Sequence, residues 1–164
     1  DRLAHYLDVV ADKTGSLIAA SARFGGMVCG ASPEVLDALS RFGEQIGVVF
    51  QLSDDIIDIA SDTSGKRPGT DLREGVLTLP TLLVAASAEP EDAHLRDLIS
   101  RPLTDEDEVA EALRLLRSHA ALREAREQIA RRAEAARSEL APLPEGHAKD
   151  ALSELCDQVV TRSM

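Results

Sequence analysis

Aromatic residues are scarce in this sequence: its 164 residues include three phenylalanines, one tyrosine and no tryptophan. A surface that stacks nucleic-acid bases needs aromatic side chains, and the chain has few to offer. Its formal net charge of -11 also repels a phosphate backbone. The composition therefore argues against nucleic acid as a partner.

Cysteines and long apolar runs are scarce as well. Cys29 and Cys156 are the two cysteines, too few for a disulfide scaffold or a cysteine-rich zinc site, so we expect a reducing compartment and a cytoplasmic protein. The apolar runs are far shorter than the ~20 residues that cross a bilayer. No apolar segment follows a charged amino-terminal region, so neither a membrane span nor a retained signal peptide is expected.

Turn-forming residues are also too few and too clustered for a β-sandwich or barrel. The chain has ten glycines and seven prolines, whereas all-β folds place turn signals about every 8–12 residues. Strong helix formers dominate instead, and apolar residues recur at steps of three and four. The sequence predicts an all-α helical bundle in which residues 1–164 form one domain, or part of one.

The apolar spacing places the helices along the chain. Ser32-Pro33 is a typical helix start, and the pattern that follows predicts one helix of about 42 Å to Ala60. Gly43 and Gly47 favour close packing of a neighbouring helix, and Gly15 is expected to loosen the chain. The remaining helices are expected over residues 2–12, 16–28, 78–87, 91–100, 104–118, 120–140 and 148–160, with a charged loop over residues 62–74.

Three aspartates lie near the end of the long predicted helix. Asp54 and Asp58 are one turn apart on the same face, with Cβ atoms about 5–6 Å apart, while Asp55 is rotated by about 100°. Two converging carboxylates that leave positions open for water and phosphate oxygens suit Mg²⁺. The alternative is a solvated helix end, which the apolar residues between the acids disfavour.

A basic, glycine-containing segment follows the aspartates. Lys66 lies twelve residues after Asp54, between Ser64 and Leu72, and such a segment can hold a diphosphate that bridges a metal. The alternative interpretation is a helix terminator with solvated charges. A P-loop is excluded, because its glycine and lysine pattern is missing and no strand precedes the segment.

The ordered combination of these motifs resembles a known family. Residues Phe50-Gln51-x-x-Asp54-Asp55-x-x-Asp58 are followed by Gly65-Lys66-x-Pro68-Gly69-x-Asp71-Leu72-x-x-Gly75-x-x-Thr78-Leu79-Pro80. This order resembles the second aspartate-rich motif and following loop of the trans-isoprenyl (polyprenyl) diphosphate synthases. Lys13-Thr14 is similar to the family's Lys-Thr pair, and the tail ending at Val159-Val160-Thr161-Arg162-Ser163 resembles its longer-chain members.

The resemblance implies a helical isoprenoid synthase fold around an apolar cavity. In this family Mg²⁺ ionises an allylic diphosphate, isopentenyl diphosphate attacks the resulting cation, and a proton is then lost. Carried over by residue, Asp54 binds the metal with Asp58 as a secondary partner, and Asp55 belongs to the motif with a less defined role.

The resemblance also assigns roles outside the aspartates. Lys13 and Lys66 would hold the leaving diphosphate, and the two lysines are expected to converge on one anion. Thr14 and Gln51 would place oxygen dipoles beside the developing cation.

Members of the family also have a first aspartate-rich motif on an earlier helix, and this sequence contains only the one at Asp54–Asp58. The chain therefore resembles the carboxyl-terminal half, and a homodimer or heteromer is expected. The rival interpretation is a non-catalytic helical subunit that pairs with an active partner. Residues 1–164 alone are expected to be inactive and to associate through uncovered apolar faces, including the inward side of residues 35–57.

Overall fold

The computed structural model describes residues 1–60 and 67–163, and the regular structure in these ranges is helical. The first helical column runs through α1 (Arg2–Val10), the π-helical turn η1 (Ala11–Gly15) and α2 (Ser16–Val28). The loosening expected near Gly15 takes the form of this π-helical turn, in which the Ser16 amide donates to the carbonyl of Ala11, five residues earlier. Gly15 is buried against Glu44, and this contact supports the continuous column.

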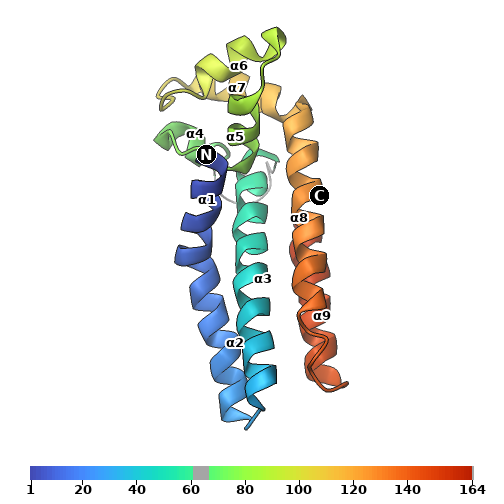
Figure 1. The fold of residues 1–164 in the computed structure, drawn as a ribbon. Helices are drawn as coiled ribbons and strands as arrows, with labels where there is room; N and C mark the ends of the chain where they lie inside the picture. The colour runs from blue at the N-terminus through green and yellow to red at the C-terminus, as the bar shows by residue number, and fades with distance from the viewer. Residues whose placement is uncertain (61–66, 164) are drawn as a thin grey trace.

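The long helix α3 (Pro33–Ala60) forms as the sequence predicts and stands beside the first column (Figure 1). A Cβ atom on Gly43 would lie 2.6 Å from the Cα of Ala19, and one on Gly47 would lie 2.7 Å from the Cα of Gly15. Both glycines therefore allow backbone-to-backbone packing of α3 on the first column, as expected.

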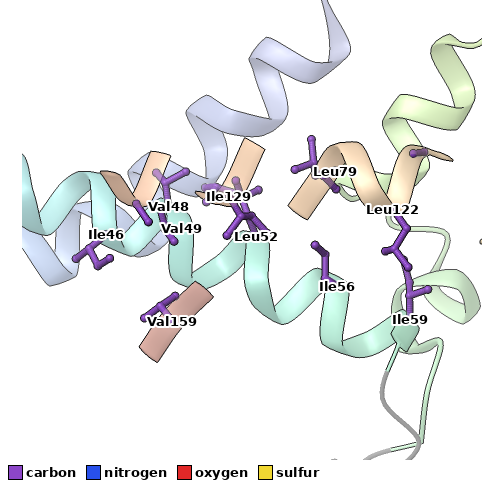
Figure 2. Close-up of a cluster of buried hydrophobic side chains, with 14 of the residues drawn as sticks. Ile46, Val48, Val49, Leu52, Ile56, Ile59, Leu79, Leu122, Ile129 and Val159 are labelled. Carbon is purple, nitrogen blue, oxygen red and sulfur yellow. The ribbon is translucent and has the colours of Figure 1, made fainter. Parts of the chain in front are cut away.

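The opposite side of α3 packs on α8 (Ala120–Ser138) and α9 (His147–Thr161). Figure 2 shows the centre of this core, where α3, α5, α8 and α9 each contribute aliphatic side chains. Leu52, Ile56 and Ile129 are completely buried there. Helix α8 packs into this core through its apolar face, and its arginines and glutamates lie mainly on the other face.

Short helices gather at the end of α3 that carries the aspartates (Figure 1). They are α4 (Thr70–Glu74), α5 (Leu79–Ala86), η2 (Pro90–Asp92), α6 (Ala93–Leu98) and α7 (Glu106–Ser118). The loop expected over 62–74 is therefore wrong for its last residues. Helix α4 begins where the Asp58 carboxylate accepts hydrogen bonds from its first amides, a tertiary cap that local sequence does not reveal.

The exposed apolar surface lies mainly on α2 and not on α3. Leu17, Phe24, Met27 and Val28 are 54–89% exposed. Residues 35–57 of α3 are all described, and among their large apolar side chains Phe50 is the exposed one, at 36%. The expectation that the inward side of α3 is uncovered is therefore largely wrong, because this chain's own helices cover it. None of the helices in the described ranges has the length and hydropathy to span a membrane.

Candidate active site

An open cleft of about 410 Å³ lies at the aspartate end of α3. Helix α3 forms one wall, the start of α4 forms another, and the residue after α9 closes the rim. The lining residues are Gln51, Asp54, Asp55, Ile57, Asp58, Thr70, Asp71 and Arg162. Three segments that are distant in sequence thus meet around the predicted acidic motif.

Asp54 lies at the rim of the cleft with 40% of its side chain exposed. Its Oδ1 atom is 2.7 Å from Nη2 of Arg162. The same guanidinium group lies over the ring of Phe50, 4.6 Å from its centroid. Arg162 is therefore the cation that neutralises Asp54 in this structure, a contact that the sequence did not reveal because 108 residues separate the pair.

Asp58 connects the acidic motif to the segment that follows it. Its Oδ1 accepts a hydrogen bond from the amide of Thr70 at 3.1 Å, and its Oδ2 accepts one from the amide of Asp71 at 3.2 Å. The carbonyl of Asp58 also accepts from Gly69, whose φ of 78° suits a residue without Cβ. Asp58 therefore fixes the start of α4 against α3, and both its carboxylate oxygens already have partners.

Asp55 faces the helix bundle and is only 4% exposed. Its carboxylate accepts hydrogen bonds from the Tyr6 hydroxyl and from Nε2 of Gln51, the second at 3.2 Å. Burial raises the pKa of Asp55, and the two hydrogen bonds oppose that rise. Burial and the charge of Asp55 raise the pKa of Tyr6, so the hydroxyl stays protonated and donates. Asp55 and Asp54 are neighbours with different environments.

Thr14 and Gln51, two residues to which the resemblance gives a role beside the cation, lie within hydrogen-bonding distance of each other. The hydroxyl of Thr14, in the π-helical turn η1, donates to Oε1 of Gln51 at 3.4 Å. Gln51 in turn donates to Asp55, so a chain of hydrogen bonds joins η1 to α3. Single π-helical turns inside α-helices are frequent at functional sites, and this one carries the Lys13-Thr14 pair.

Among the described residues that line the cleft, four aspartates face one arginine. The pKa of Asp71 is raised to about 6 by burial and by the charges of Asp58, Asp55 and Glu74. A bound cation would relieve this repulsion, so the residues fit a divalent metal. Asp71 belongs to the motif that carries the family resemblance, but no role was predicted for it. The feature that could have indicated one is its position as an acidic residue within a basic segment.

The predicted basic residues are only partly described. Lys13 lies exposed on η1, next to Thr14. Lys66 lies outside the described residues, so its convergence with Lys13 stays a prediction. Across residues 1–60 and 67–163, no three His, Cys, Asp or Glu side chains form a ready ligand set for a metal. Water and diphosphate oxygens would have to complete any Mg²⁺ sphere, as Mg²⁺ sites usually allow.

The all-helical architecture is that of the isoprenoid synthases. Geranylgeranyl pyrophosphate synthase from Corynebacterium glutamicum, solved with calcium and isoprenyl diphosphate, matches with a TM-score of 0.90 at 43% identity over 97% of this chain and 50% of that chain. Polyprenyl synthase from Caulobacter crescentus, also with calcium and isoprenyl diphosphate, matches with a TM-score of 0.88 at 35% identity, over 98% of this chain and 50% of that chain.

Sequence comparison gives the family. The family described as polyprenyl synthetase matches residues 1–116. Nonaprenyl diphosphate synthase of Mycobacterium tuberculosis is 49% identical over 164 residues, which are 99% of this chain and 49% of that protein. The chain therefore belongs to the polyprenyl synthetase family, as the motifs predict. It spans about half the length of the curated relatives that it matches.

Proposed function

We propose that this chain contributes the allylic-diphosphate side of a prenyltransferase that condenses isopentenyl diphosphate with an allylic diphosphate to make a polyprenyl diphosphate. The observation that carries the proposal is the open acidic cleft, where Asp54 and Asp58 face a rim that also holds Asp71. Metal and isoprenyl diphosphate in solved relatives of the same fold support it.

Mg²⁺ is the proposed metal. When bound, it would neutralise the diphosphate and make it a better leaving group. Asp54 would hold it through the carboxylate oxygen that Arg162 leaves open, and Asp58, whose oxygens hold the start of α4, would be a secondary partner from the next turn. Asp55 supports the motif from inside the bundle, because its oxygens already accept two hydrogen bonds.

The remaining roles follow from position around the cleft. Lys13 and Lys66 would bind the leaving diphosphate by charge. Gln51 and Thr14 would orient oxygen dipoles toward the allylic cation, a form of electrostatic stabilisation at the place where charge develops. The site for isopentenyl diphosphate would come from the part of the relatives that this chain does not match. A homodimer or a heteromer with another synthase subunit is part of the proposal.

A prenyl-transfer assay on the full-length protein tests the function. Radiolabelled isopentenyl diphosphate and an allylic diphosphate should give an extended product with Mg²⁺ and none with a chelator. Asp54→Ala should lower turnover by about 10²–10³-fold, the size seen when one stabilising group is removed from an active site.

Asp37→Ala is the matched control. Asp37 is an exposed aspartate of the same helix with its own arginine partner, Arg23, at 3.0 Å. Turnover within about twofold of wild type is expected for it, since exposed pairs are worth little. A wild-type protein without any transfer activity would favour the non-catalytic subunit instead.

A further inference from the structure

The hydrogen bond between Tyr6 and Asp55 joins two helices behind the cleft. Tyr6 lies on α1 and is half-buried, and Asp55 lies on α3, 49 residues later. Tyr6 is the single tyrosine of the chain. It is not among the described residues that line the cleft, so it has no place from which to touch a substrate there.

The bond is part of a network with a defined direction. Asp55 accepts from Tyr6 at Oδ2 and from Gln51 at Oδ1. Since the amide nitrogen of Gln51 donates to Asp55, its oxygen is left to accept from Thr14. An amide can be reversed by rotation about its last bond, and here the charged acceptor fixes which end faces which neighbour. Asp55 thereby sets the orientation of Gln51.

Tyr6 in turn fixes Asp55. A buried carboxylate must keep its hydrogen-bond donors, because a buried charge without partners is costly. Gln51 donates to one oxygen and the Tyr6 hydroxyl donates to the other, with the Leu79 backbone as a further hydrogen-bond partner of Asp55. Without that hydroxyl, the carboxylate would turn toward the donors that remain, and the Gln51 amide would lose its fixed acceptor.

We infer that Tyr6 is a positioning residue of the proposed active site, which acts through Asp55 to hold Gln51 and Thr14 in their catalytic orientation. The inference rests on the proposed function. It assigns the two neighbouring aspartates to separate tasks: Asp54 faces metal and substrate, whereas Asp55 transmits the constraint from Tyr6.

This role predicts a specific kinetic signature. Removing the hydroxyl leaves Asp54, Asp58 and Lys13 in place, so metal and diphosphate should still bind. The loss should fall on groups that act as charge develops, and such a loss lowers kcat and leaves KM unchanged. A purely structural role for Tyr6 would instead lower the unfolding temperature without separating kcat from KM.

The test uses the full-length protein with Tyr6→Phe, Asp55→Asn and the double variant. Tyr6→Phe keeps the ring and removes the hydroxyl. Asp55→Asn keeps the volume but offers one acceptor oxygen for two donors, so it breaks the same pattern from the acceptor side. Each should lower kcat about tenfold, while the KM for the allylic diphosphate and the Mg²⁺ concentration for half-maximal rate stay within twofold.

Coupling between the two positions is the decisive result. The double variant should be no slower than Asp55→Asn, because Tyr6 acts only through that carboxylate. Ser40→Ala is the control: it removes a half-buried hydroxyl from α3 that bonds the Leu36 carbonyl, far along the helix from the cleft. The Ser40→Ala variant should have an unchanged kcat, and its unfolding temperature should fall by about as much as that of Tyr6→Phe.

The outcomes separate the two proposals. Two results with an active wild type would overturn this inference alone. One is a kcat that Tyr6→Phe leaves unchanged, and the other is additive effects of Tyr6→Phe and Asp55→Asn on kcat. An inactive wild type would overturn the proposed function and this inference with it. If Tyr6→Phe fails to fold, Asp55→Asn still decides, because an unchanged kcat there removes the link to Gln51.

Discussion

Two faces of one helix show how neighbouring aspartates come to differ. The open face of α3 carries Asp54, which is 40% exposed and paired with Arg162. The inner face carries Asp55, which is 4% exposed and held by Tyr6 and Gln51. A rotation of about 100° between consecutive helical residues is enough to separate the two environments. The same residue type thus faces an open cleft on one side and a hydrogen-bond network on the other.

The tasks of an acidic motif therefore depend on which residues of the folded bundle surround each position. Asp58 illustrates a third case, since it lies on the open face yet caps the start of α4 through two backbone amides. An exposed carboxylate with one free oxygen is suited to a metal. A carboxylate whose oxygens are occupied is suited to holding structure.

Neutralising each aspartate in turn should separate the two environments most clearly. Asp54→Asn should lower kcat of the full-length protein by about 10²-fold or more, because the metal loses its charged ligand. Asp55→Asn should cost about tenfold, the loss expected of a positioning residue. Steady-state kinetics with circular dichroism on each variant checks the ranking. Equal and mild effects at Asp54, Asp55 and Asp58 would refute the metal assignment.

The close packing of α3 on the first column, at Gly43, should affect stability and not catalysis. Gly43→Ala places a Cβ 2.6 Å from the backbone of Ala19, so it should lower the free energy of unfolding by about 1–3 kcal/mol. Gly25→Ala is the matched control, since nothing lies within 4 Å of its added Cβ. It should stabilise the protein by about 0.5–1 kcal/mol through helix propensity. Urea denaturation curves of both variants measure the contrast, and equal effects would contradict the close packing.

On the open face, the partner of Asp54 can be removed. Arg162→Met removes a half-exposed ion pair worth about 0–1 kcal/mol, so a metal ion no longer competes with Arg162 for the Asp54 carboxylate. The affinity for Mn²⁺ alone, followed by calorimetry, should rise by up to about fivefold. Arg41→Met, which breaks an exposed pair with Glu139 elsewhere, is the control and should leave the affinity unchanged. A lower Mn²⁺ affinity in Arg162→Met would show that Arg162 does not compete with the metal.

A pH-dependent effect on stability is expected at Asp71. Because its pKa in the folded state is about 6 instead of 3.8, the folded state holds that proton more tightly. Ionisation of Asp71 therefore destabilises the fold as the pH rises from about 4 to 6. Asp71→Asn should raise the unfolding temperature at pH 7 and lose this advantage toward pH 4. Thermal scans at both pH values check the sign, and an advantage that is larger at pH 4 would contradict it.

The sequence was a good guide to elements that local patterns determine. The long helix α3 begins at Pro33 as predicted, because its start signal and apolar spacing lie in the segment itself. The close contacts of Gly43 and Gly47 were predicted for the same reason. The family was predicted from an ordered series of motifs, and the comparisons confirm it.

The failures share a cause, which is dependence on distant residues. The sequence predicted a looser helix near Gly15 but not a π-helical turn packed against α3. Helix α4 was missed because its cap is the side chain of Asp58, twelve residues before Thr70. Tyr6 and Arg162 gave no local signal, since their partners on α3 are brought near only by the folded bundle.

The most direct test of the division between the two faces is the position of a bound metal. A crystal of the full-length protein soaked with Mn²⁺ and inorganic diphosphate gives an anomalous signal that locates the ion independently of activity. If Asp54 holds the metal, a peak is expected within about 2.3 Å of an Asp54 oxygen, with Asp55 still bonded to Tyr6. A peak on Asp55, with its bond to Tyr6 broken, would contradict the account.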